Sequence, residues 1–237
     1  MTPAIIEPPF HVSHVLFDVD GTLVDYGLAM RAAFAAAAAR CSVITGRAVT
    51  GEDIRETRAR VVGDPLWQRR IPTEQRRETM WRLLAERGVA AVTLHAAIEA
   101  VLFDYQEARD RALTVFPDVV ETLNVLRARG LTLVAASNGD VDLGRVGIGA
   151  HIASTHYAAD LGVAKPAPRF FALAIERLGI EAGRAVMVGD RVDNDYAPAI
   201  AVGMAAVVID RAARVIEPDV LRIGTLTELP GLIAAPD

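Results

Sequence analysis

The chain has 237 residues, of which 52% are hydrophobic, and it carries a formal net charge of −5 at neutral pH. The negative charge argues against nucleic acid or an anionic membrane as the main partner, and the longest apolar run, residues 196–209, is too short and too broken to span a bilayer. A single cysteine, Cys41, excludes an intrachain disulfide and a cysteine-based zinc site. The first ten residues lack the pattern of a secretory signal, so we expect a cytoplasmic protein.

A short apolar run near the N-terminus leads directly into two aspartates. Residues 1–12 contain three prolines and are expected to form a loose leader, and the first strand is expected over residues 14–19. Residues i and i+2 of an extended segment project to the same face, so the Asp18 and Asp20 carboxylates would repel unless a cation or a shared proton intervened. This costly arrangement suggests chemistry, although Asp20-Gly21 is also a common turn signal.

The following segment reads as helical. Residues 28–40 are rich in alanine, which favours helix, and further helices are expected over residues 51–62, 73–87 and 92–111. The arginines of this segment, Arg58 and Arg76 among them, are expected to be mostly solvated on helix faces. The alternative is that one or two of them, with Trp67 or Trp81, reach the substrate when the cap closes. Residues 27–112 therefore form a predicted all-helical insert.

After the insert, helices and strands alternate. Alternation of this kind predicts a doubly wound parallel α/β sheet, formed by residues 1–26 and 113–237. The expected helices span residues 118–129, 168–178, 194–202 and 226–233, and the expected strands span residues 131–136, 152–156, 184–189 and 204–209. Asp193 is expected to cap the helix that begins near Asn194, and the alternative is that it serves as a further acidic ligand.

Polar side chains follow three of these strands. They are Asp18 and Asp20, Ser137 and Asn138, and the segment from Asp190 to Asp195, while Lys165 precedes a helix on the same side. The carboxyl ends of parallel strands share one edge, where ligands gather, so these residues are expected to meet in one crevice. Lys165 is the single lysine among 25 basic residues. Oxygen ligands without cysteine or histidine suit Mg²⁺.

The same residues carry a family resemblance. In order along the chain, Phe17-Asp18-Val19-Asp20-Gly21-Thr22, Ser137-Asn138-Gly139, Lys165-Pro166 and Val188-Gly189-Asp190-Arg191-Val192-Asp193-Asn194-Asp195 resemble the four motifs of the haloacid dehalogenase superfamily of phosphohydrolases. The helical insert resembles the cap domain that some members carry between the first and second motifs. The resemblance extends over residues 14–210.

The resemblance implies a role for each motif position. Asp18 would attack phosphorus to form an aspartyl-phosphate, and Asp20 would act first as general acid and then as general base. Ser137, Asn138 and Lys165 would bind the transferring phosphoryl group.

The resemblance also implies a metal site. Asp18, the backbone carbonyl of Asp20, Asp190 and the closing acidic position Asp195 would hold Mg²⁺, which compensates charge during phosphoryl transfer.

Within the superfamily, Asp20 favours phosphate ester hydrolysis, because members that cleave carbon–halogen bonds generally lack an acid at that position. The predicted cap contains no lysine, which argues against the phosphonate-cleaving relatives that use a cap lysine. The expected activity is Mg²⁺-dependent hydrolysis of a small phosphorylated metabolite by a monomer or homodimer. A sugar phosphomutase and a catalytically silent binding protein remain alternatives.

Overall fold

The computed structural model describes residues 7–68 and 70–234. The chain divides into two compact units, one formed by Met1–Asp25 and Val115–Asp237 and the other by Tyr26–Thr114. We refer to them as the core unit and the cap unit. The predicted insert, residues 27–112, begins one residue later and ends two residues earlier than the cap unit.

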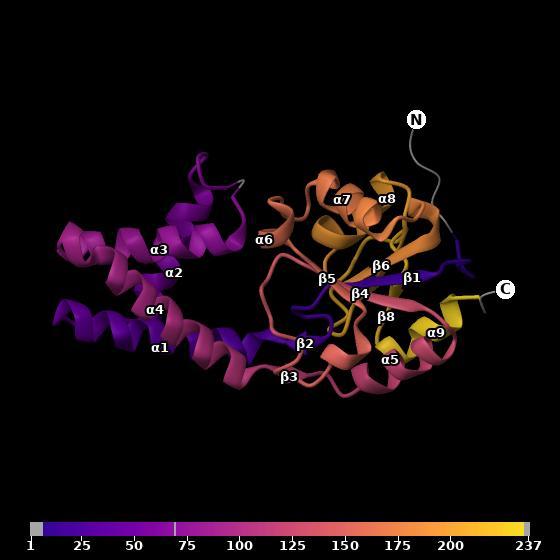
Figure 1. The fold of residues 1–237 in the computed structure, drawn as a ribbon, viewed down its shortest axis with the longest axis horizontal. Coiled ribbons are helices and arrows are strands. Elements are labelled where there is room, and N and C mark those ends of the chain that lie inside the picture. Colours follow the sequence, from indigo (N-terminus) through magenta and orange to yellow (C-terminus); the bar gives the residue numbers. More distant parts are fainter. Residues whose placement is uncertain (1–6, 69, 235–237) are drawn as a thin grey trace. The chain divides into compact units, whose positions relative to one another are not determined.

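The core unit is built on one six-stranded sheet (Figure 1). Its order is β5-β4-β1-β6-β7-β8, and every pairing between neighbours is parallel. The strands are β1 (His14–Phe17), β4 (Thr132–Ser137), β5 (Ser154–Tyr157), β6 (Ala185–Gly189), β7 (Ala205–Ile209) and β8 (Arg222–Ile223). The predicted doubly wound α/β sheet is thereby confirmed, with β8 as an unpredicted edge strand.

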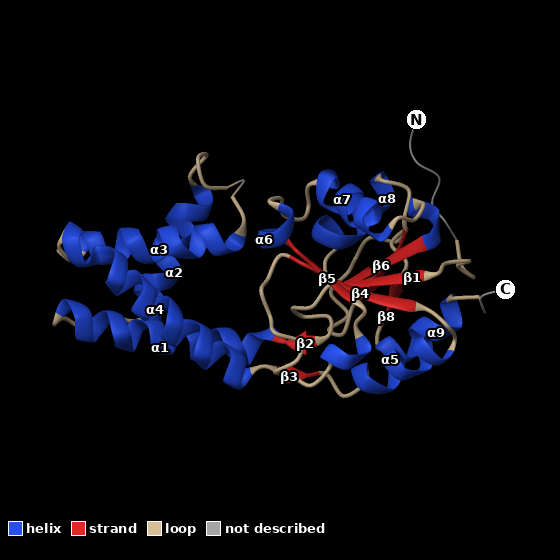
Figure 2. Ribbon diagram, in the orientation of Figure 1, coloured by secondary structure: helices blue, strands red, loops and turns tan. Residues whose placement is uncertain are grey.

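Helices cover both faces of this sheet (Figure 2). Helices α7 (Pro168–Leu178) and α8 (Ala197–Ala201) lie on one face, and α5 (Val119–Ala128) and α9 (Leu229–Leu232) on the other. A short helix, α6 (Ala158–Leu161), follows β5. The predicted closing helix is wrong in part, because residues 226–228 form a 3₁₀ turn before α9.

The central strands explain why the sequence reads as continuous apolar runs. Val15, Leu16 and Phe17 of β1 are fully buried, as expected for a parallel strand covered on both faces. Phe17 pairs with Ala135 of β4 on one side and with Val188 of β6 on the other. This register brings the carboxyl ends of β4, β1 and β6 side by side.

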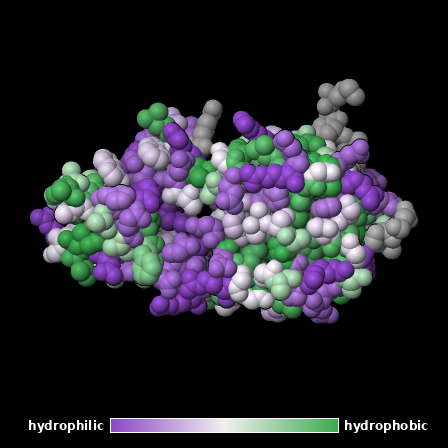
Figure 3. Space-filling model, in the orientation of Figure 1, coloured by the Kyte–Doolittle hydropathy of each residue, from purple (hydrophilic) through white to green (hydrophobic). Residues whose placement is uncertain are grey.

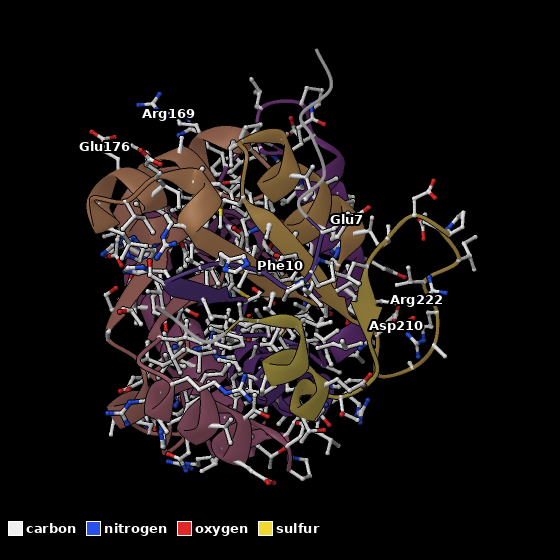
Figure 4. The ribbon with its side chains drawn as sticks, turned by 90° about the vertical axis from the view of Figure 1, so that its right-hand side faces the viewer. Glu7, Phe10, Arg169, Glu176, Asp210 and Arg222 are labelled. Carbon is white, nitrogen blue, oxygen red and sulfur yellow. The ribbon has the colours of Figure 1, made fainter. Side chains whose placement is uncertain are left out.

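The expected loose leader is wrong at Phe10 and Val12, which are buried, while residues 7–9 are exposed. Phe10 is fully buried, and its backbone N–H donates to the Leu232 carbonyl over 2.8 Å while its carbonyl accepts from the Ala234 N–H over 3.0 Å. Figure 4 labels Phe10 beside the sheet, in contrast to the exposed Arg169 and Glu176 of α7. Residues 1–6 lie outside the described residues.

The cap unit is a bundle of four helices (Figure 1): α1 (Tyr26–Thr45), α2 (Gly51–Gly63), α3 (Pro72–Glu86) and α4 (Ala91–Ala112). Thr50 and Asp53 form a capping box that starts α2, and Pro72 occupies the first turn of α3. Buried Ile54, Leu84 and Val101 belong to the shared apolar core of the bundle.

Helix α1 is long and apolar enough to cross a membrane by length and composition alone. Its buried residues include Ala29, Ala33, Ala37 and Cys41, which recur every four positions and form one stripe. The small side chains let α1 pack closely against α4, its principal neighbour in the bundle. This packing accounts for the buried alanines of the helix.

Two short strands, β2 (Val24–Asp25) and β3 (Thr114–Val115), pair with each other where the chain passes between the two units. On the surface, hydrophilic and hydrophobic side chains are interspersed over the face in Figure 3. The large exposed apolar residues, such as Val43 of α1, Val92 of α4 and Ile216 of the loop between β7 and β8, come from separate segments, which is ordinary for a protein surface.

Candidate active site

A buried ammonium joins two buried carboxylates at the carboxyl edge of the sheet. Lys165 Nζ donates to Asp18 Oδ1 over 2.7 Å and to Asp195 Oδ1 over 2.6 Å, and its side chain is fully buried. Burial alone would lower the pKa of Lys165, but the charges and hydrogen bonds of the two carboxylates outweigh it and raise the pKa. The lysine therefore stays protonated.

Asp190, directly after β6, adds a third carboxylate. Asp18, Asp190 and Asp195 each offer an oxygen, and these oxygens lie within 4.8 Å of one another. Burial, followed by repulsion from Asp18 and Asp195, raises the pKa of Asp190 to about 7. Burial likewise raises the pKa of Asp195 to about 6, against the opposing charge of Lys165. The crowding of negative charge is thus only partly relieved by one ammonium.

Asp20 lies on the turn that follows β1. This turn is close to the turn after β6, which carries Asp190, and to the turn after β4, which carries Gly139. Gly21 has φ of +86°, and a Cβ at this position would come within 2.5 Å of Asp190 Oδ2. A Cβ on Gly139 would come equally close, 2.5 Å, to Asp20 Oδ2. The positive φ of Gly21 favours glycine at that position, and the two close approaches bring Asp20 and Asp190 to the same edge.

Ser137 ends β4 and Asn138 follows it, beside this turn. Ser137 is buried, and its Oγ accepts from the Gly139 N–H over 3.0 Å. The Asn138 amide pairs with the backbone of Lys165: its Nδ2 donates to the Lys165 carbonyl over 2.8 Å, and its Oδ1 accepts from the Lys165 N–H over 2.7 Å. Asn138 therefore fixes the loop that presents the lysine.

The segment after β6 differs from its prediction. Residues Val192–Tyr196 form a π-helical turn that leads into α8, and Asp193 does not cap a helix but forms an exposed ion pair with Arg191 over 2.8 Å. The turn directs Asp195 inward, where its Oδ2 accepts from the Arg191 N–H over 3.2 Å. A one-turn π-helix is a frequent feature of functional sites.

Thr22 is a neighbour of Asp18 that sequence reasoning did not single out. It is fully buried, and its hydroxyl donates to Asp18 Oδ2 over 3.4 Å. Arg211, just after β7, donates to the Thr22 carbonyl over 3.0 Å and to Asp118 over 2.7 Å, and its guanidinium lies 4.0 Å from the centre of the Phe116 ring. Arg211 thus supports the turn that carries Thr22. The sequence feature that could have pointed to Arg211 is its position as a cation just after the predicted strand over residues 204–209.

The three described carboxylates Asp18, Asp190 and Asp195 fit a divalent cation. Oxygen donors at this spacing are the ligands that a hard cation prefers. Three ionised carboxylates and one ammonium leave two negative charges in the cluster, which a divalent cation would balance. Asp20 does not belong to this group of side chains, and its predicted contribution is the backbone carbonyl.

Comparisons with known proteins place the chain in a family. Curated relatives include the phosphoserine phosphatase of Thermus thermophilus, 33% identical over 127 residues that make up 50% of this chain and 51% of the relative. They also include the phosphoglycolate phosphatase of Shigella dysenteriae serotype 1, 29% identical over 81% of this chain and 79% of the relative. The chain spans about half the length of the curated relatives that it matches first.

A solved structure of a 2-haloacid dehalogenase from Pseudomonas syringae pv. Tomato has a TM-score of 0.80 to this chain. The two are 31% identical, and the match covers 93% of this chain and 97% of the dehalogenase. The sequence pattern of the haloacid dehalogenase-like hydrolases matches residues 12–203, which include every motif described above. This chain belongs to the haloacid dehalogenase-like hydrolase family.

Proposed function

We propose that the protein is a Mg²⁺-dependent phosphomonoesterase that hydrolyses a small phosphorylated metabolite through an aspartyl-phosphate on Asp18. The observation that supports this proposal most strongly is the buried cluster of Asp18, Lys165, Asp190 and Asp195, with the second acid, Asp20, on the adjoining turn. The names of the phosphoserine and phosphoglycolate phosphatases among the relatives point in the same direction.

Asp18, Asp190 and Asp195, together with the backbone carbonyl of Asp20, would hold the metal. When bound, Mg²⁺ would supply charge compensation for the phosphoryl oxygens. Among the protein's own groups, the Lys165 ammonium, 2.7 Å from Asp18 Oδ1, is placed to neutralise the same oxygens. The Ser137 hydroxyl and the second amide N–H of Asn138 would donate to the phosphoryl group.

The first half of the reaction forms a bond between an Asp18 oxygen and phosphorus and breaks the bond between phosphorus and the ester oxygen. Asp20 gives its proton to that departing oxygen, so the alcohol leaves neutral. In the second half, Asp20 takes a proton from water as the water oxygen attacks phosphorus. The bond between phosphorus and Asp18 then breaks, which releases phosphate and restores the Asp18 carboxylate and the protonated Asp20. The hydrogen bond from Thr22 to Asp18 would orient the nucleophile in both halves.

Dehalogenation is a second candidate, favoured by the likeness to the Pseudomonas syringae 2-haloacid dehalogenase. In that chemistry the Asp18 carboxylate would attack carbon and displace halide. Halide leaves without a proton, so the reaction has no use for an acid at Asp20, whereas an alcohol leaving group needs one. The presence of Asp20 on the turn beside Asp190 therefore favours phosphate ester hydrolysis.

The test is a panel of phosphorylated metabolites and short 2-haloacids, assayed for phosphate and halide release with Mg²⁺ and with chelator. The native chain is compared with Asp18→Asn and with Asp193→Asn, a matched control in which an exposed aspartate of the same motif is changed. We expect phosphate release that requires both Mg²⁺ and Asp18 and survives in Asp193→Asn. Halide release without phosphate release would establish the second candidate, and loss of neither activity in Asp18→Asn would refute both. Action in the cytoplasm stays a prediction.

A further inference from the structure

Tyr157, the last residue of β5, lies beside the proposed site, and the phosphoryl chemistry described above does not use it. Strand β5 is an edge of the sheet and neighbours β4 (Figure 1). In the parallel pairing of these two strands, Tyr157 is the partner of Ser137. Residues paired in this way project their side chains to the same face of the sheet. The Tyr157 ring therefore extends from the carboxyl edge on the face to which Ser137 projects.

The Tyr157 hydroxyl is engaged by the loop that follows β4. It donates to the Val141 carbonyl over 2.6 Å, and the Val141 side chain is almost fully buried. Burial, followed by the negative charges of Asp20 and of further aspartates nearby, raises the pKa of Tyr157. The hydroxyl therefore stays protonated and able to donate in the neutral range, and it lies close enough to Asp20 to experience its charge.

Residues 138–141, which we call the strap, are fastened near both ends. At the first end, the Asn138 amide exchanges two hydrogen bonds with the backbone of Lys165, over 2.8 Å and 2.7 Å. At the second end, the Val141 carbonyl accepts the bond from Tyr157. The side chains that fasten the strap thus come from β5 at one end and from the strap itself at the other.

The middle of the strap lies against the carboxyl group of Asp20. A Cβ on Gly139 would come within 2.5 Å of Asp20 Oδ2 and within 3.5 Å of Asp20 Cγ. The Gly139 N–H donates to Ser137 Oγ over 3.0 Å, which holds the strap close to the end of β4. Contact on this side limits the directions in which the short Asp20 side chain can turn.

We propose that Tyr157 is a positioning residue: by holding the Val141 end of the strap, it keeps the Asp20 carboxyl group directed at the departing ester oxygen. Tyr157 acts through Gly139 of the strap and does not touch the reacting atoms. A general acid must stay within hydrogen-bond reach of the oxygen that it protonates, and misplacement by about 1 Å can cost about 10²-fold in rate. The inference rests on the proposed function, in which Asp20 is that acid.

The first test asks whether Tyr157 fastens the strap, and it needs no substrate. Tyr157→Phe removes the hydroxyl and keeps the ring. Tyr105→Phe is the matched control, because it deletes a hydroxyl that donates to Met30 Sδ within the cap unit. Amide hydrogen exchange of the peptide that contains residues 138–141 is followed by mass spectrometry in the full chain with chelator.

We expect this peptide to exchange roughly 2- to 10-fold faster in Tyr157→Phe, the range that corresponds to loss of one neutral hydrogen bond. In Tyr105→Phe it should exchange at the native rate. An exchange rate in Tyr157→Phe equal to that of the native chain would overturn the proposal, because the strap would then be held without the tyrosine.

The second test measures kcat/KM for propyl phosphate and for p-nitrophenyl phosphate with Mg²⁺. Propanol needs a proton in order to leave, whereas p-nitrophenolate needs none. Tyr157→Phe is expected to lower the value for propyl phosphate by roughly tenfold and that for p-nitrophenyl phosphate by less than about twofold. Tyr105→Phe is expected to leave the ratio of the two values unchanged. Equal losses in Tyr157→Phe are the mark of a merely structural role and, like the absence of any loss, would overturn the proposal.

The Asp20→Asn background separates the failure of this proposal from the failure of the proposed function. Once the positioned group is gone, Tyr157→Phe is expected to change kcat/KM for propyl phosphate by less than about twofold, and a further tenfold loss would overturn the positioning role. If Asp20→Asn lowers the values for both esters equally, or if the native chain hydrolyses neither ester, the proposed function fails and this role of Tyr157 fails with it. If Asp20→Asn is selective for propyl phosphate and Tyr157→Phe is not, only the positioning role is refuted.

Discussion

Replacement of Lys165 by methionine removes the ammonium that contacts two of the three clustered carboxylates. Lys165 Nζ lies 2.7 Å from Asp18 Oδ1 and 2.6 Å from Asp195 Oδ1, and the side chain is fully buried. Methionine has a similar length and adapts to buried sites, so the shape of the site is largely kept. The substitution therefore isolates the effect of the charge.

The expected change in the free energy of unfolding follows from two opposing effects, the attraction between the charges and the desolvation of the ammonium. At an effective dielectric constant of about 20, two unit charges about 3 Å apart attract by about 5 kcal/mol. Part of this attraction offsets the desolvation of the ammonium, and removal of one partner from a buried pair typically costs about 3–5 kcal/mol. We expect Lys165→Met to lower the free energy of unfolding by about that amount near pH 8 without metal.

The loss should depend on pH. Burial and neighbouring carboxylates raise the pKa of Asp190 to about 7 and burial raises that of Asp195 to about 6 in the folded chain, above the ordinary value of 3.8. A raised carboxyl pKa favours the folded state at low pH, and this contribution is lost as the pH rises through the folded pKa. Without Lys165 the carboxylates take up protons more readily, so the cost of the substitution should shrink towards pH 5.5.

Urea denaturation near pH 8 and near pH 5.5, in chelator, measures both effects. Mg²⁺ at the higher pH should also reduce the cost, because a divalent cation supplies the missing positive charge. Arg191→Met is the control, because it breaks an ion pair with Asp193 whose side chains are 60% and 72% exposed, which is expected to cost less than about 1 kcal/mol. A loss for Lys165→Met below about 1 kcal/mol at both pH values would refute the electrostatic account of the cluster.

Three further outcomes are expected. Mg²⁺ at about one hundred times its dissociation constant should stabilise the native chain by about 2.7 kcal/mol in thermal melts, and Asp190→Asn should largely lose this shift; an undiminished shift would remove Asp190 from the metal site. Asp20→Asn should slow hydrolysis of alkyl phosphates by about 10²–10⁴-fold but that of p-nitrophenyl phosphate much less, since its leaving group needs no proton; equal losses would contradict a general acid at Asp20. Arg211→Met breaks a half-buried ion pair with Asp118 and a hydrogen bond to Thr22, and should lower the free energy of unfolding by about 2 kcal/mol in urea; an unchanged free energy would show that this support is dispensable.

The sheet could be predicted because its strands are covered on both faces. A buried parallel strand must be apolar along its length, and β1, β4, β6 and β7 are such runs that stop at a polar residue or glycine. Parallel topology then places their carboxyl ends together, so Asp18, Ser137 and Asp190 could be assigned to one edge. Strand β8, with two residues, is too short to carry any pattern.

Other features depend on contacts that leave no local pattern. Arg211 and Asp118 are 93 positions apart, and only the folded chain brings them together beneath Thr22. Asp193 and Asp195 occupy similar sequence surroundings, yet the π-helical turn exposes one and buries the other. Arg76 has the sequence character of a solvated helix residue, and its contact with Tyr105 of α4 depends on how the cap helices pack.

The most direct test of the proposed mechanism is the detection of a phosphoryl group on Asp18. The native chain is mixed with its best phosphate ester and Mg²⁺, quenched in acid during turnover, and digested for mass spectrometry. We expect a gain of one phosphoryl group on the peptide that contains Asp18, and its absence from Asp18→Asn and from the chelator control. Turnover of the ester without any phosphorylated Asp18 peptide, or with phosphate release retained in Asp18→Asn, would contradict the proposed aspartyl-phosphate.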